Sequence, residues 1–72
     1  MTPDELATAL ADALRDNLSL AIEETTGADD MYVTDVATYE RAGVLTADPG
    51  VVVTFSDGSE YQITAHLSRN PR

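Results

Sequence analysis

The feature of this sequence that most constrains its fold is a leucine or isoleucine at every fourth position near the N-terminus. The repeat comprises Leu6, Leu10, Leu14, Leu18 and Ile22, and Ala7, Ala11, Ala13 and Ala21 widen the same apolar face. A spacing of four keeps side chains on one face of an α-helix, which has 3.6 residues per turn. Polar residues fill the opposite arc: Thr8, Asp12, Arg15, Asp16, Ser19 and Glu23. We therefore expect an amphipathic helix from about residue 3 to residue 25.

Both ends of this helix carry local signals. Thr2 can cap the first turn, Pro3 suits the first helical position, and Glu5 can complete a capping box. At the other end, Gly27 can adopt the left-handed conformation that terminates helices. The helix should therefore begin after Thr2 and end before Gly27.

A β-hairpin is expected near the C-terminus, where two apolar runs flank Asp57-Gly58. A two-residue loop would mix apolar and polar side chains on both faces, whereas a three-residue loop, residues 56–58, separates them. Gly58 would then be left-handed at a bulge. The apolar face would be Val51, Val53, Phe55, Tyr61, Ile63, Ala65 and Leu67, and the other face Val52, Thr54, Glu60, Gln62, Thr64 and His66. We expect Val53, Phe55, Tyr61 and Ile63 to be buried against Leu10, Leu14 and Leu18.

Residues 31–41 are rich in β-branched and aromatic types, which predicts a long strand. Its alternation is irregular, so either a bulge intervenes or both faces are partly used. A helix over residues 34–42, ended by Gly43, is the alternative. If this strand lies at a sheet edge, it has no lysine or proline to prevent pairing with other chains. An inward-pointing Asp35 could provide that protection instead.

These segments predict an α+β fold in the order α-β-β-β. One long N-terminal amphipathic helix would pack on a three-stranded antiparallel β-meander. We expect a single domain over residues 1–67 and a flexible basic tail over residues 68–72, which holds two of the four arginines.

The charge balance excludes some partners. The 72 residues include thirteen acids, four arginines and no lysine, for a net charge of −9. Direct binding to nucleic acid or to an anionic membrane is therefore disfavoured. Lysine scarcity is typical of a GC-rich bacterium, its phage or a salt-adapted archaeon. The absence of cysteine and of a long apolar run suggests a cytoplasmic location, or a virion if the gene is phage-borne.

No residue pattern indicates catalysis, a metal or a cofactor. His66 is the only histidine, and it falls on the polar face of the hairpin. Asp29 and Asp30 fit a polar turn after the helix. The stretch from Asp57 to Glu60 is too short for a calcium loop. We therefore expect a protein that is not an enzyme.

The remaining hypothesis is a small interaction, assembly or accessory protein that docks on a protein partner or on copies of itself. One candidate surface is the polar face of the hairpin, Glu60, Gln62, Thr64 and His66. The alternative function is an acidic mimic of nucleic acid that inhibits a DNA- or RNA-binding protein. Its surface would be an acidic ridge, Asp12, Asp16, Glu23, Glu24, Asp29 and Asp30.

Overall fold

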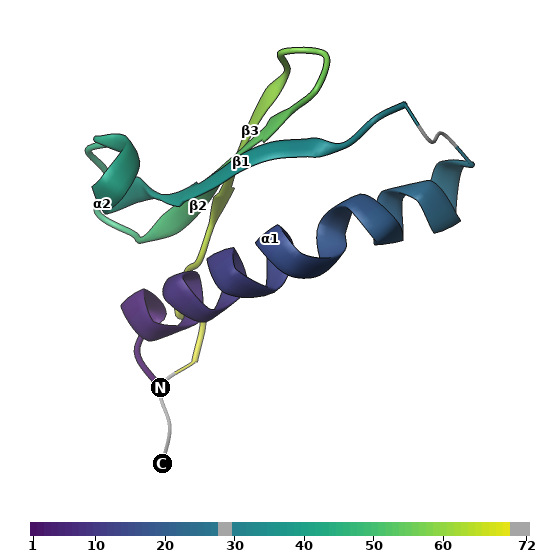
Figure 1. Cartoon of the computed structure of the whole chain (residues 1–72). Coiled ribbons are helices and arrows are strands. Elements are labelled where there is room, and N and C mark those ends of the chain that lie inside the picture. The colour runs from purple at the N-terminus through teal and green to yellow at the C-terminus, as the bar shows by residue number, and fades with distance from the viewer. Residues whose placement is uncertain (28–29, 70–72) are drawn as a thin grey trace.

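The computed structural model describes residues 1–27 and 30–69. One helix lies across an antiparallel sheet of three strands (Figure 1). The elements are α1 (Pro3–Thr26), β1 (Val33–Thr38), α2 (Tyr39–Ala42), β2 (Gly50–Phe55) and β3 (Glu60–Thr64). The strand order is β1-β2-β3, with β2 in the centre. The predicted α+β fold, a long N-terminal helix on a three-stranded meander, is confirmed.

The two ends of α1 form as their residues predict. The Thr2 hydroxyl accepts a hydrogen bond from the Glu5 amide at 3.1 Å, and the Glu5 carboxylate accepts one from the Thr2 amide at 2.9 Å. At the other end Gly27 is left-handed, with φ 75°, and its N–H donates to the Glu23 carbonyl. Local capping chemistry therefore sets the length of the helix.

Within the expected apolar face of α1, two alanines are buried more deeply than the leucines. Ala7 and Ala11 are its fully buried residues, whereas Leu10 and Leu14 are half-buried and Leu6 is exposed. Small side chains allow the helix backbone to approach the sheet closely. The alanine side of the expected apolar face is therefore nearest the sheet, and Leu10, Leu14 and Leu18 pack around the core beside it.

Two polar residues continue the alanine stripe at the same spacing of four. The Arg15 guanidinium donates from Nε and Nη2 to the Val36 carbonyl, at 3.1 and 2.9 Å. The Ser19 hydroxyl accepts a hydrogen bond from the Val33 amide at 3.0 Å. Arg15 and Ser19 were expected to face solvent, and they instead bind α1 to the backbone of the edge strand β1.

Residues 31–41 divide between a strand and a helix, so the expectation of one long strand is wrong. The strand covers Val33–Thr38, and Tyr39–Ala42 form a short helix that ends at left-handed Gly43. Thr38 causes the change, because its hydroxyl caps the helix by accepting from the Arg41 amide. The alternative of a helix ended by Gly43 is thus correct for the last part of the segment.

A bulge accounts for the irregular alternation of β1. The register against β2 shifts between Val33 and Asp35, with Val33 opposite Phe55 and Val36 opposite Val53. The extra residue turns both valines toward the helix although they lie three positions apart. Asp35 is exposed and does not point inward.

The predicted hairpin register between β2 and β3 is confirmed. Val51 pairs with Ile63 and Val53 with Tyr61. The Phe55 amide donates to the Ser59 carbonyl, which leaves a loop of residues 56–58, and Gly58 has φ 90°. Only the three-residue loop places the apolar residues of both strands on one face.

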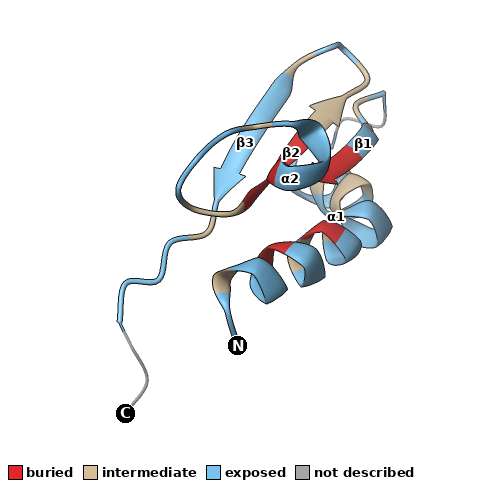
Figure 2. Cartoon of the chain, turned by 90° about the vertical axis from the view of Figure 1, so that its left-hand side faces the viewer, coloured by how far each residue is buried: buried red, intermediate tan, exposed pale blue. Residues whose placement is uncertain are grey.

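Burial is confined to α1, β1, β2 and the start of α2, as Figure 2 shows by colour. The central cluster is Ala11, Val36, Val51 and Val53, with Leu10, Leu14, Leu18, Val33 and Phe55 packed around it. All five residues of β3 are exposed. The main core cluster is therefore small and lies between α1 and the sheet, and Ala37, Tyr39 and Val52 are buried outside it.

The prediction that Tyr61 and Ile63 are buried is wrong, since their exposed fractions are 59% and 42%. Their register is as expected, but α1 packs against β1 and β2. A helix is about 10 Å wide and strands lie about 4.8 Å apart, so one helix covers little more than two strands. Because Arg15 and Ser19 hold α1 at β1, the third strand is left uncovered.

The close approach of α2 to the sheet requires a glycine at the start of β2. The Tyr39 side chain is buried, and its hydroxyl lies 2.7 Å from Thr64 Oγ1. A Cβ at position 50 would lie 2.3 Å from the Ile63 carbonyl oxygen and 2.6 Å from the Tyr39 ring. Gly50 thus allows the Tyr39 side chain to tie α2 to β2 and β3.

The role of Arg15 can be tested by Arg15→Met, which keeps the apolar stem and removes the guanidinium. The Val36 carbonyl would lose both donors inside the protein, so the free energy of unfolding should fall by about 1–3 kcal/mol. Arg41→Met is the matched control, since the Arg41 side chain makes no hydrogen bond within the described residues. It should change stability by less than about 0.5 kcal/mol. Equal losses in urea denaturation of the two variants would contradict the role assigned to Arg15.

Candidate interaction surface

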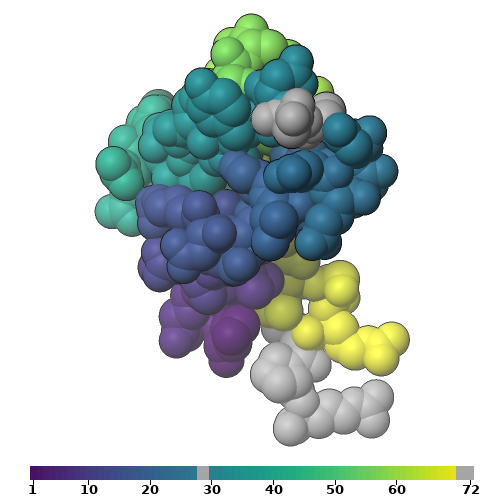
Figure 3. Space-filling model, turned by 45° about the vertical axis from the view of Figure 1, so that its right-hand side comes forward, coloured from purple at the N-terminus to yellow at the C-terminus, as the bar shows by residue number. Residues whose placement is uncertain are grey.

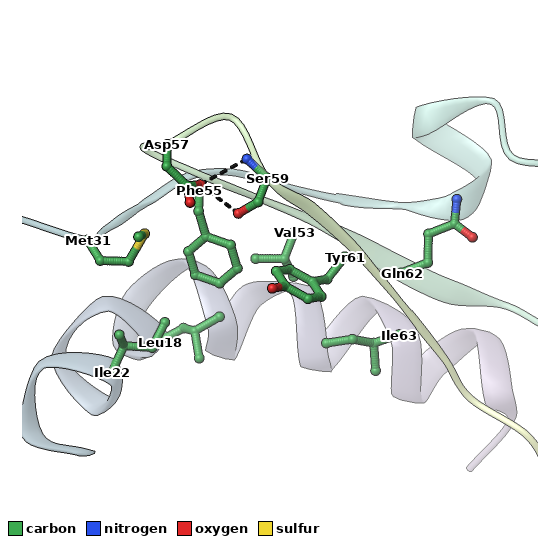
Figure 4. Close-up of a pocket in the computed structure, with 10 residues that line it drawn as sticks. All are labelled: Leu18, Ile22, Met31, Val53, Phe55, Asp57, Ser59, Tyr61, Gln62 and Ile63. Atoms are coloured by element: carbon green, nitrogen blue, oxygen red, sulfur yellow. Dashed lines mark hydrogen bonds between the residues drawn. The ribbon is translucent and has the colours of Figure 1, made fainter. Parts of the chain in front are cut away.

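An open apolar groove of about 450 Å³ lies between the C-terminal half of α1 and the hairpin of β2 and β3 (Figure 4). The groove exists because α1 packs against β1 and β2 and does not cover β3. Its lining comprises Leu18, Ile22, Met31, Val53, Phe55, Asp57, Ser59, Tyr61, Gln62 and Ile63. Most of these side chains are apolar, and they come from both layers of the fold.

Figure 4 shows the side chains that form the walls of the groove. Leu18 and Ile22 point from α1 toward the sheet, and Phe55 and Tyr61 point from the hairpin toward α1. The two rings meet edge to face, with centroids 5.6 Å apart and an interplanar angle of 83°. This packing orients the Tyr61 ring although more than half of the residue is exposed.

Asp57 is the one acidic residue in the lining of the groove. Its carboxylate accepts hydrogen bonds from the Ser59 hydroxyl at 2.6 Å and from the Ser59 amide at 2.9 Å. These bonds, the hydroxyl first, lower the pKa of Asp57 below its usual value. The groove therefore carries a single negative charge at the hairpin end, and the rest of its surface is uncharged.

The backbone of β3 is available along its outer edge. The Phe55 amide donates to the Ser59 carbonyl, and the Ala65 amide donates to the Pro49 carbonyl. In an antiparallel ladder alternate residues bond the same neighbour, so the odd-numbered residues of β3 face β2. The backbone groups of Glu60, Gln62 and Thr64 consequently point away from the sheet, where no other described element covers them.

The outer edge of β1, in contrast, is occupied by α1. Arg15 donates to the Val36 carbonyl, and Ser19 accepts from the Val33 amide. The expectation that the segment over residues 31–41 provides an unprotected edge is therefore wrong for this part of it. Between the two edge strands, β3 is the one with free pairing capacity.

The residues of the two predicted candidate surfaces lie on different elements of the fold. Asp12, Asp16, Glu23 and Glu24 are exposed on α1, Asp30 is exposed after it, and Asp29 lies outside the described residues. Arg15 Nη1 lies 2.8 Å from Asp12 Oδ1 and so offsets one charge of the ridge. Glu60, Gln62 and Thr64 are exposed on β3.

His66 belongs to the segment that follows β3 and runs beside the start of α1 (Figure 3). It is exposed, and its Nδ1 lies 3.1 Å from Asp48 Oδ2. This pair links the segment after β3 to the loop before β2. Residues 68 and 69 of the predicted basic tail are exposed, and residues 70–72 lie outside the described part of the chain.

Sequence reasoning missed the groove because it assigned Tyr61 and Ile63 to the core. One signal could have indicated it. Three strands supply more apolar positions on one face than a single helix about 10 Å wide can cover. The surplus apolar positions had to be exposed at one edge, and the arginine in the helix decides which edge that is.

Within residues 1–27 and 30–69, no group of three or more His, Cys, Asp or Glu side chains could hold a metal ion. None of the described helices combines the length and the apolar character needed to cross a membrane. Comparisons of the chain with protein-family models, curated proteins and solved structures find no match. The chemistry of the groove and of the β3 edge is therefore the basis for a functional interpretation.

The unfolding free energies of two truncated variants, measured in dilute solution, distinguish the buried core from the exposed strand β3. Val53→Ala removes two carbons from a residue that is 1% exposed, and should cost about 2 kcal/mol of unfolding free energy. Ile63→Ala removes three carbons, but should cost only about 1 kcal/mol because the side chain is half solvated. A larger loss for Ile63→Ala than for Val53→Ala would show that β3 is covered in the monomer.

Proposed function

We propose that this chain is a non-enzymatic interaction protein that docks on protein through the outer edge of β3 and the adjoining groove. The observation that carries the proposal is the exposed strand β3 with an apolar groove directly beside it. An extended segment that adds to such an edge gains main-chain hydrogen bonds, and alternate side chains fill the neighbouring pocket.

The character of the β3 edge supports this proposal. Exposed edge strands are commonly blocked by lysine, proline or a bulge, because free backbone groups attract other strands. The strand Glu60–Thr64 contains neither lysine nor proline, and its ladder with β2 is regular. Tyr61 and Ile63 also present exposed apolar surface on the groove side. These features suit a surface that a partner covers.

The charge distribution of the chain is compatible with docking at this place. Thirteen acids repel most anionic surfaces, but Asp57 is the one acid that lines the groove and Glu60 the one acid in β3. An apolar segment can therefore enter the groove without desolvating several carboxylates, which would be costly. The acidic surface elsewhere maintains solubility.

The second candidate function is the acidic mimic of nucleic acid. The exposure of Asp12, Asp16 and Glu23 on α1 favours it, since a mimic must present carboxylates where a target expects phosphates. The ion pair between Arg15 and Asp12 weakens it. Binding by a mimic should weaken steeply as salt rises, whereas docking at β3 should not weaken.

Partner recovery from an extract of the native cells can test both functions with matched variants. The groove variant is Ile63→Asp, and the ridge variant combines Asp12→Lys, Asp16→Lys and Glu23→Lys. Bound proteins, including untagged copies of the chain itself, are identified by mass spectrometry. We expect the wild type and the ridge variant to recover the same partner and the groove variant to lose at least about nine-tenths of it, since 1.4 kcal/mol is tenfold.

Two results would overturn the proposal. Loss of the partner in the ridge variant with retention in the groove variant would establish the mimic instead. Retention of the partner in both variants would place the docking surface elsewhere on the chain.

A further inference from the structure

The folded chain exposes more surface than its length predicts. Its accessible area is 5305 Å², whereas a folded chain of this size exposes about 4,300 Å². The radius of gyration is 13.3 Å, against about 11 Å for a compact chain of this length. Tyr61 and Ile63 of β3 are among the large hydrophobic residues that the chain leaves exposed. The surplus of about 1,000 Å² is large enough to contain an interface of the roughly 800 Å² per partner that a stable complex buries.

We propose that β3 pairs with β3 of a second copy of this chain, which joins two three-stranded sheets into one sheet of six strands. This inference rests on the proposed docking at β3 and names the docking partner. Two identical strands can pair antiparallel about a two-fold axis, so each supplies the same surface to the other. Both grooves would then lie on the same side of the joint sheet and face each other across the axis.

The backbone of β3 determines the register of this pairing. Glu60, Gln62 and Thr64 have outward-pointing backbone groups, so these residues must form the hydrogen-bonded pairs. With the two-fold axis at Gln62, all five residues of the strand overlap. Gln62 then exchanges two hydrogen bonds with Gln62 of the second copy, and Glu60 lies opposite Thr64.

The same register matches the apolar side chains. Tyr61 lies opposite Ile63 of the second copy, and the two-fold axis repeats this pair. Aromatic and β-branched residues on facing strand positions stabilise antiparallel pairs. Leu18 and Ile22 line the same groove from α1. Two half-covered grooves thus become one apolar channel between the two helices.

Electrostatics permits this contact more readily than any contact through α1. Each β3 strand carries one acid, and Glu60 faces a threonine rather than Glu60 of the second copy. Asp12 and Asp16 are on α1 and do not line the groove. The net charge of −9 on each chain still opposes association at long range. Because salt screens that repulsion, dimer formation should strengthen as ionic strength rises.

Cysteine cross-linking tests the register, because the chain has no cysteine of its own. The Cα atoms of a hydrogen-bonded antiparallel pair lie about 5.5 Å apart, which suits a disulfide. Gln62→Cys should therefore yield a covalent dimer under mild oxidation. Glu60→Cys is the matched control, since its two copies would lie about 14 Å apart, or four residues at roughly 3.4 Å each. Failure of Gln62→Cys to cross-link, or equal cross-linking of both variants, would overturn this pairing.

Sedimentation of the chain without cysteines provides a second test. We expect a wild-type dimer whose dissociation constant falls at least several-fold between about 0.05 and 0.5 M salt. Gln62→Pro should be monomeric and folded by circular dichroism, because the Gln62 amide points outward and donates to no strand of its own chain. A dimer that persists in Gln62→Pro would contradict the proposal.

Failure of the self-pairing and failure of the docking function give different results. A wild type that stays monomeric and a Gln62→Cys variant that does not cross-link would overturn the pairing alone. The docking function would still stand if a different protein were recovered by the wild type and lost with Ile63→Asp. If the chain neither pairs with itself nor recovers such a protein, both proposals are overturned.

Discussion

The position of α1 across the sheet is the constraint on which the rest of this structure depends. Ala11 packs into the core, and the next residues at a spacing of four, Arg15 and Ser19, hydrogen-bond the backbone of β1. The two bonds from the Arg15 guanidinium satisfy a carbonyl that a leucine at this position would leave unpaired. They also hold the helix at one edge of the sheet, so β3 at the other edge is uncovered.

One-sided packing links the stability of the chain to its proposed function. The core cluster consists of small residues, Ala11, Val36, Val51 and Val53, and the sequence has no cysteine that could form a disulfide. A domain of this length is marginally stable, because it buries only about 60% of its extended surface. Covering Tyr61 and Ile63 by a second copy would bury apolar surface that the single chain leaves exposed. The groove would then be both the docking surface and a source of stability.

Features set by neighbouring residues could be predicted from the sequence. The capping box at Thr2 and Glu5 involves residues three apart, and the hairpin register follows from alternation around Gly58. The division of residues 31–41 was harder, because the capping hydroxyl of Thr38 competes with a sequence of high strand propensity. Which edge of the sheet α1 leaves exposed could not be predicted, since it depends on Arg15 reaching a strand 21 positions away.

Amide hydrogen exchange of Gln62 as a function of protein concentration tests the central claim most directly. In dilute solution its outward-pointing amide should exchange rapidly while the amides of β2 remain protected. At high concentration exchange at Gln62 should slow markedly, because the amide then donates to the second copy. Slow exchange at every concentration would mean that the chain itself covers β3. Rapid exchange at every concentration would mean that β3 pairs with no second copy.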